Sequence, residues 1–123
     1  MSQFSFGKHK RLLNASDYKS VFDRADIKVS HKHVLLLARK NNLTYNRLGM
    51  VIAKKNIRLA VQRNRAKRII RESFRCNTIS QGLDIVVLAR RGLDQIENAQ
   101  FHTLITTQWL QLSRKLLRLN GNN

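Results

Sequence analysis

Proline is absent from this chain, cysteine occurs once, and Asp and Glu together number only seven. Without proline, the chain has no rigid Pro-rich linker or docking motif. Cys76 alone forms no internal disulfide and no thiolate zinc site, so we expect a reducing, cytoplasmic location. No apolar run reaches the roughly 18 residues that span a bilayer. The first residues lead into charge rather than an apolar core, so we expect no secretory signal.

Positive charge is the dominant feature of the 123 residues. Twenty-four Lys and Arg give a formal net charge of +17, while 42% of the residues are hydrophobic. That apolar content is typical of a folded protein, so we expect one domain over 1–123, with a flexible basic arm at 1–13 and a frayed tail at 120–123. Such a charge favours nucleic acid, which releases condensed counterions on binding. An anionic membrane surface is the competing partner, but the apolar faces described below are needed for the core.

Three strands and a short helix are predicted from local patterns. Asn14 or Ser16 is placed to cap a helix that carries Tyr18, Val21 and Phe22 on one face. Residues 27–39 alternate as a strand, with Val29, His31, His33 and Leu35 on one face, although two shorter strands also fit. Residues 47–53 form a second strand, in which Gly49 indicates a bulge or a close backbone approach. Residues 83–89 are apolar enough for a central strand.

Two longer helices complete the pattern. Over residues 101–119, apolar side chains share one arc of about 140° on a helix: Phe101, Leu104, Ile105, Trp109, Leu112, Leu116 and Leu119. Over residues 63–75, an apolar arc (Ala66, Ile69, Ile70, Ser73, Phe74) adjoins a cationic one (Lys67, Arg71, Asn64, Arg75, Arg68). Like charges four residues apart repel, so this cationic face is more stable with anions bound. Arg65 also falls outside the apolar arc, and we expect replacement of Arg65, Arg68 and Arg71 with Ala to leave the fold intact.

At this helix the sequence resembles the protein subunit of bacterial ribonuclease P. The match centres on AKKNIRLAVQRNRAKRIIRESFR, residues 53–75, and extends to RLLNASDYKSVF, RLGMVIAKK and DIVVLARRG. The resemblance implies an α+β two-layer sandwich in the order α-β-β-β-α-β-α, with a mixed sheet and a left-handed β-α-β crossover. General rules for parallel strands favour a right-handed one.

The resemblance also implies a function and a set of site residues. A catalytic RNA that requires magnesium would cut precursor tRNA at its 5′ end, and the protein would bind that RNA and the precursor's single-stranded leader in a cleft. The residues matching the catalytic-RNA site are Arg63, Asn64, Arg65, Lys67, Arg68, Arg71, Arg75, Lys54 and Lys55. Those matching the leader site are Tyr18, Phe22, Leu36, Lys67, Arg90 and Arg91. Position 36 is aromatic in some family members, and here it is Leu.

No catalytic side chain, bound cofactor or protein metal site is expected, and the resemblance implies a monomer in a 1:1 complex with the RNA. The alternatives are a ribosomal protein or RNA chaperone, a helix-turn-helix regulator and a protein-only nuclease. Strand segments on both sides of the basic helix argue against helix-turn-helix. His31 and His33 share a predicted strand face but lack a third ligand or acid nearby.

Overall fold

The computed structural model describes residues 11–12, 14–77 and 82–121. Its elements follow the predicted order of one helix, three strands, a helix, a strand and a helix. They are α1 (Ala15–Arg24), β1 (Ile27–Ser30), β2 (Val34–Lys40), β3 (Arg47–Val51), α2 (Ala60–Cys76), β4 (Leu83–Ala89) and α3 (Asn98–Gly121), with the short 3-10 helix η2 (Leu93–Gln95) before α3. The predicted fold class is confirmed.

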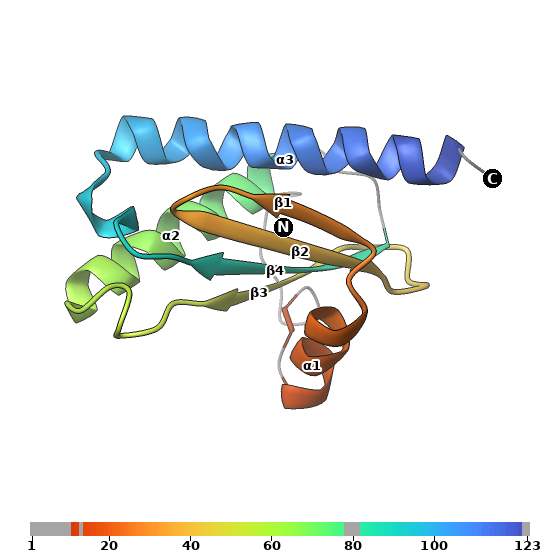
Figure 1. Cartoon of the computed structure of the whole chain (residues 1–123), viewed down its shortest axis with the longest axis horizontal. Helices are drawn as coiled ribbons and strands as arrows, with labels where there is room; N and C mark the ends of the chain where they lie inside the picture. The colour runs from red at the N-terminus through yellow and green to blue at the C-terminus, as the bar shows by residue number, and fades with distance from the viewer. Residues whose placement is uncertain (1–10, 13, 78–81, 122–123) are drawn as a thin grey trace, which may run out of the picture.

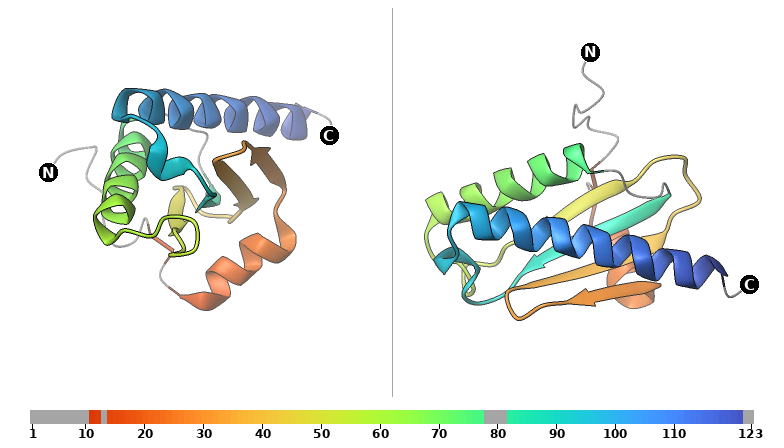
Figure 2. Two further views of the ribbon diagram at one scale, coloured as in Figure 1. Left: turned by 60° about the vertical axis from the view of Figure 1, so that its left-hand side comes forward. Right: turned by 90° about the horizontal axis from the view of Figure 1, so that it is seen from above.

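The four strands form one mixed sheet in the order β1-β2-β4-β3. Neighbours β1 and β2, and β2 and β4, are antiparallel, whereas β3 and β4 are parallel. As predicted, β4 is central, and all its side chains except Leu88 are buried. Figures 1 and 2 show α3 along one face of the sheet, with α2 beside it, while α1 lies across part of the opposite face.

The connection from β3 through α2 to β4 is left-handed. The helix α2 passes on the α3 side, where Phe74 of α2 meets Trp109 of α3 with ring centroids 6.1 Å apart. Turning the right-hand view of Figure 2 until β3 and β4 point upward places β4 to the left of β3, with the helices in front. The rule for parallel strands predicts the opposite hand, so this feature follows the resemblance rather than general physics.

The segment 27–39 is a hairpin of two strands, so the face predicted for it is wrong. The chain reverses at residues 31–33, where His31 N donates to Val34 O at 2.9 Å. Val29 pairs with Leu36 and Ser30 with Leu35 across the hairpin. Alternation restarts after the turn, so the buried side chains are Ile27, Val29, Val34, Leu36 and Ala38.

The buried stripe of α3 is the one predicted. Phe101, Ile105, Trp109, Leu112 and Leu116 are buried, and Leu104 and Leu119 pack partly buried against them. Trp109 Nε1 donates to Ser73 Oγ of α2 at 2.7 Å, which ties the two long helices together.

At both ends of the chain, the fold includes residues that the sequence predicts to be a flexible arm and a frayed tail. Arg11 bridges to Leu48, and Leu12 is buried. Asn120 and Gly121 continue α3. Residues 1–10, 13 and 122–123 lie outside the described residues, so the rest of the expected arm and tail stay predictions.

Candidate nucleic-acid interface

The helix α2 packs one face and leaves the adjoining face in solvent. Its buried side chains are the predicted set, Ala66, Ile69, Ile70, Ser73 and Phe74. Asn64, Arg68, Arg71 and Arg75 are exposed, and Lys67 is half-buried. Four of these residues are cations: Lys67, Arg68, Arg71 and Arg75. Within the described residues, none of the four makes an ion pair or a side-chain hydrogen bond, and Glu72 pairs with none of them. The face therefore presents free cationic groups to a polyanion.

Two arginines of the predicted site point inward instead. Arg63 Nη1 donates to the carbonyl oxygens of Ile57 and Arg58 at 3.1 and 2.7 Å. Arg65 Nε donates to Asn98 Oδ1 at 2.6 Å, and its Nη2 donates to Ile96 O. The Arg65 guanidinium also lies 5.6 Å from the centre of the Phe101 ring. Arg65 therefore joins α2 to the start of α3, which argues against the expectation that its removal leaves the fold unaffected.

The loop before α2 is pinned to the body and carries two exposed lysines. Ile57 is fully buried, and Asn56 Nδ2 donates to Ala89 O at 2.9 Å. With Arg63 holding two carbonyls of the same loop, Lys54 and Lys55 are presented from a fixed backbone. These two lysines lie in the segment that leads directly into α2, so they extend its cationic surface.

The helix α1 carries the two aromatics of the predicted leader site. Asn14 Oδ1 caps it by accepting from Asp17 N at 2.9 Å, and Val21 is buried against the sheet. The Tyr18 ring lies over Gly49, where a Cβ atom would come within 2.7 Å of it, and Tyr18 Oη accepts from Met50 N at 3.2 Å. The predicted close approach at Gly49 is confirmed. Phe22 remains 43% exposed, so its ring is available to a ligand.

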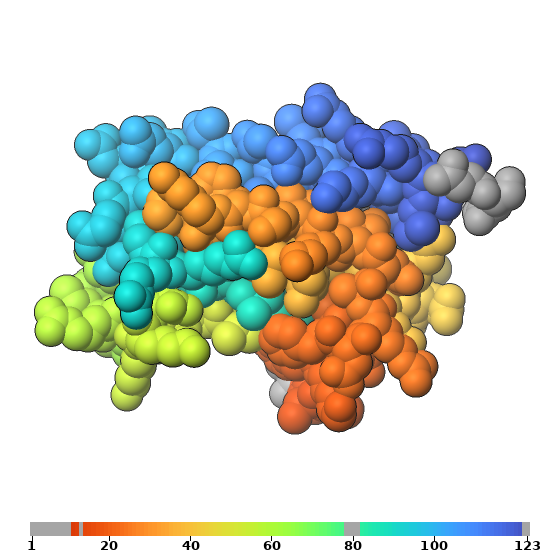
Figure 3. All heavy atoms as spheres, in the orientation of Figure 1, coloured from red at the N-terminus to blue at the C-terminus, as the bar shows by residue number. Residues whose placement is uncertain are grey.

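The sheet face beside α1 is apolar and only partly covered. Leu37, Val51 and Leu88 lie half-buried around the small cluster of Leu12, Val21 and Val86. Figure 3 shows a recess along the lower edge of the molecule, between α1 and the segment that leads into α2. A chain lying in this recess would run between α1, the helix that carries Phe22, and the basic loop.

Leu36 does not belong to this face. It is 1% exposed and packs in the core beneath α3, because alternation along β2 turns only Leu35, Leu37 and Arg39 toward α1. The assignment of Leu36 to the leader site is therefore corrected. The error has the same origin as the wrong face predicted for 27–39: the turn at residues 31–33 resets the alternation.

Arg90 and Arg91 follow β4 at the tip of the β1–β2 hairpin. Arg90 Nη1 donates to Ser30 Oγ and His31 O at 3.1 and 2.8 Å, while the Arg91 side chain is exposed. His33 Nδ1 lies 2.9 Å from Arg91 O, and His33 N donates to His31 Nδ1 at 3.1 Å. Burial and the nearby positive charges of His33, Lys32 and Arg90 lower the pKa of His31. Arg90 thus braces the hairpin, and Arg91 is the free cation of the two.

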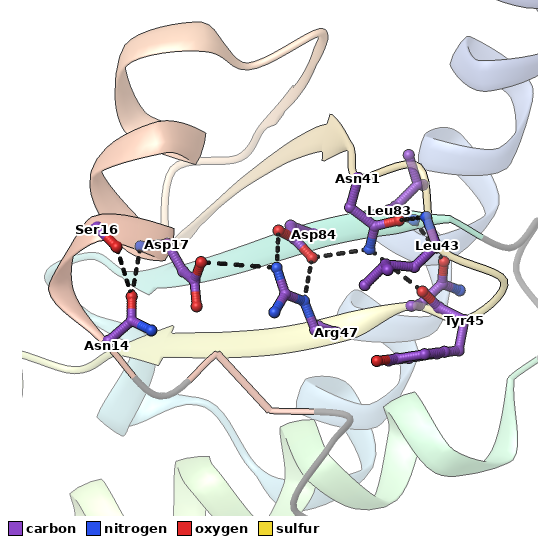
Figure 4. Close-up of polar contacts among 10 residues, drawn as sticks. Asn14, Ser16, Asp17, Asn41, Leu43, Tyr45, Arg47, Leu83 and Asp84 are labelled. Atoms are coloured by element: carbon purple, nitrogen blue, oxygen red, sulfur yellow. Dashed lines mark hydrogen bonds and ion pairs between the residues drawn. The ribbon is translucent and has the colours of Figure 1, made fainter.

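A polar network at the other end of the sheet was not predicted. Arg47 binds the carboxylate of Asp84 through two hydrogen bonds of 2.8 and 2.7 Å, and Asn41 Nδ2 donates to the same carboxylate at 2.8 Å (Figure 4). Asp17 of α1 lies 3.7 Å from Arg47. The hydrogen bonds to Asp84, together with its negative charge, raise the pKa of Arg47. The sequence signal that could have indicated this network is Asp84 itself, because an acidic side chain inside a buried strand requires a partner of opposite charge.

The described residues contain neither a metal-ligand cluster nor a membrane-spanning helix. No three His, Cys, Asp or Glu side chains gather there as ligands for a metal ion. In the same part of the chain, no helix has the length and hydrophobicity to cross a membrane.

Comparison with known proteins supports a role with RNA. The family described as Ribonuclease P matches residues 6–113. The ribonuclease P protein component of Pseudomonas aeruginosa is 54% identical over 110 residues, which are 89% of this chain and 82% of that protein. That of Marinomonas sp. is 46% identical over 123 residues, 99% of this chain and 93% of that protein.

Solved structures share the fold as well. The Thermotoga maritima RNase P protein has a TM-score of 0.69 and 31% identity, and the similarity covers 85% of this chain and 96% of that one. The Staphylococcus aureus RNase P protein has a TM-score of 0.72 and 25% identity, with 87% and 94% covered.

Proposed function

The chain belongs to the family of ribonuclease P protein components, subunits of the ribonucleoprotein that processes tRNA, and from this membership we propose how its surfaces divide the work. The exposed cations of α2, together with Lys54 and Lys55, bind the catalytic RNA. The unpaired state of Lys67, Arg68, Arg71 and Arg75 carries this assignment, because groups with no partner in the described part of the protein are free to meet phosphates. The alternative of a ribosomal protein or RNA chaperone is not supported.

The single-stranded leader of precursor tRNA binds on the sheet face beside α1. Phe22 supplies an exposed ring on which a base stacks, and Tyr18 lines the same helix face. Lys67 and Arg91 supply positive charge, and Arg90 acts through the hairpin that it braces. Arg63 and Arg65 act by holding α2, its entry loop and the start of α3 in place.

Cleavage of the phosphodiester is carried out by the RNA subunit with its own magnesium ions. The protein contributes binding and placement of the precursor, as one copy per RNA, and no side chain of the chain takes part in bond breaking. Positive charge at the interface also lowers the repulsion between two RNAs brought together, so the protein lowers the magnesium concentration that they need.

The proposal is tested by cleavage of precursor tRNA at low magnesium by the RNA subunit, with and without this protein. We expect the protein to restore cleavage, and Arg68→Ala together with Arg71→Ala to weaken that rescue without changing the melting temperature. Cleavage by the protein without RNA would contradict catalysis by the RNA. Full rescue by the double variant would place the RNA-binding surface elsewhere.

A further inference from the structure

Two large aliphatic side chains stand exposed at the start of the basic helix. Val61 is 69% exposed and Leu59 is 53% exposed. Both positions run against the preferences of a helix start. Leu59 is the N-cap residue and makes no capping hydrogen bond, although Ser, Thr, Asp or Asn is favoured there. The first turn of α2 contains no acidic residue. Neither side chain is therefore explained by helix formation or by packing.

Val61 lies in line with the cations of the same helix. At about 100° per residue, Val61, Asn64, Arg68, Arg71 and Arg75 fall within an arc of about 80°. All five side chains are exposed. A partner that lies along the three arginines therefore reaches Val61 about two turns beyond Arg68, and Leu59 stands at the N-cap of the same helix. Val61 is thus continuous with the cationic face of α2, and Leu59 is exposed at the same end of the helix.

We propose that Val61 and Leu59 form the apolar end of the catalytic-RNA interface, where they pack against the face of an unstacked base. This inference rests on the proposed binding of the catalytic RNA by α2. Lys and Arg recognise phosphates without regard to sequence, whereas exposed bases of loops and bulges offer apolar faces that aliphatic side chains can cover. Proteins that bind the minor groove of DNA likewise combine cationic side chains with aliphatic wedges that pack against bases. The pair thus adds local recognition of an unpaired base to an otherwise electrostatic contact.

Salt dependence separates this contact from the ionic ones. Binding of the full-length protein to the catalytic RNA is titrated at several KCl concentrations for Val61→Ala, Leu59→Ala and Arg68→Ala. We expect Val61→Ala and Leu59→Ala each to weaken binding about three- to tenfold at every salt concentration, because apolar burial releases no counterions. Arg68→Ala should instead reduce the slope of log affinity against log salt by about 0.7–0.9.

The third helix offers matched controls. Leu117 and Leu110 of α3 are 67% and 53% exposed, and these exposed fractions match those of Val61 and Leu59. They lie on a different helix. Leu110 lies within residues 92–113, which contain no Lys or Arg, whereas Leu117 is flanked by Arg114, Lys115 and Arg118 and so controls for an apolar side chain beside cations outside α2. Leu117→Ala and Leu110→Ala should leave RNA affinity unchanged. Leu59→Ser adds a second readout: a new N-cap should raise the melting temperature by about 2–5 °C while RNA affinity falls.

The outcomes distinguish this inference from the proposed function. Wild-type affinity of Val61→Ala and Leu59→Ala, with weaker binding by Arg68→Ala, would overturn the apolar contact alone. Wild-type affinity of all three would overturn the proposed α2 interface as well. Equal losses in the α3 controls, or a loss seen only when precursor binds the assembled enzyme, would overturn the assignment to the catalytic RNA.

Discussion

Individual arginines of the basic helix differ in what their guanidinium groups touch. Arg63 and Arg65 donate to carbonyl and amide oxygens of their own chain, whereas Arg68, Arg71 and Arg75 are exposed and make no such bonds in the described part of the protein. Residue type and helical position alone do not reveal this division, because Arg65 also lies off the apolar arc. A charge count along the helix would therefore overestimate the number of groups available to RNA.

Arg65→Ala is expected to destabilise the fold, and Arg68→Ala is not. The loss of hydrogen bonds from Arg65 to Asn98 and Ile96 should lower the free energy of unfolding by about 1–2 kcal/mol. Arg68→Ala serves as the matched control, since it removes the same side chain from the same helix. Denaturant unfolding of both variants measures the difference. Equal stabilities would mean that the contacts of Arg65 contribute nothing net.

Gly49→Ala should disturb Tyr18 specifically. The added Cβ would lie within 2.8 Å of three atoms of the phenol, so the ring must move and its bond from Met50 N is lost. We expect a loss of about 1–3 kcal/mol in stability, as for other overpacked sites. A double-mutant cycle tests the cause: Gly49→Ala should cost less in the Tyr18→Ala background. Additive losses would show that the clash with Tyr18 is not the reason.

At the scale of helices and strands, sequence periodicity predicted the buried face of each element that has an uninterrupted repeat. The buried faces of α2 and α3 followed from apolar spacing, since one helix turn fixes which residues share a side. The alternation across residues 27–39 failed because a turn at 31–33 resets it, and nothing in His31-Lys32-His33 marks a turn. The Arg47–Asp84–Asn41 network joins three separate segments, so no local pattern contains it. In the candidate site, the cationic face was predictable, but the inward contacts of Arg63 and Arg65 were not.

The turn between β1 and β2 should make stability depend on pH. Burial lowers the pKa of His31 below its usual 6.5, and its Nδ1 accepts a hydrogen bond from His33 N, which requires an unprotonated Nδ1. The unfolded chain therefore takes up a proton before the folded chain does. The contribution of His31 is complete above pH 6.5 and is lost as pH falls below it toward the lowered folded pKa.

Melting temperatures measured from pH 7.5 down to pH 5 test this, with His31→Gln as the comparison. We expect the wild type to lose more stability than His31→Gln across that range. The carboxylates are common to both proteins, so their titration cancels in the difference. Parallel curves for the two proteins would remove His31 as a source of the pH dependence.

On the scale of the whole molecule, the two proposed RNA surfaces belong to helices on opposite faces of the sheet. The helix α2, which carries the cations, packs on the α3 side of the sheet, whereas α1, which carries Phe22, lies across the opposite face (Figures 1 and 2). The pinned loop that carries Lys54 and Lys55 connects them. One domain can therefore hold the catalytic RNA and the leader at once, and a change at Phe22 need not affect binding of the catalytic RNA.

Phe22→Ala is expected to separate these two activities. Its exposed ring contributes little to the core, so the melting temperature and the affinity for the catalytic RNA should stay at wild-type values. Capture of precursor tRNA with a long leader by the assembled enzyme should weaken by about 1–3 kcal/mol, the usual value of one stacked base. Leaderless tRNA should bind as before, since it has no base to place on the ring. Leu110→Ala on α3 removes a comparably exposed side chain and should change neither affinity. Equal losses on both substrates, with a lower melting temperature, would show that Phe22 supports the fold rather than the leader.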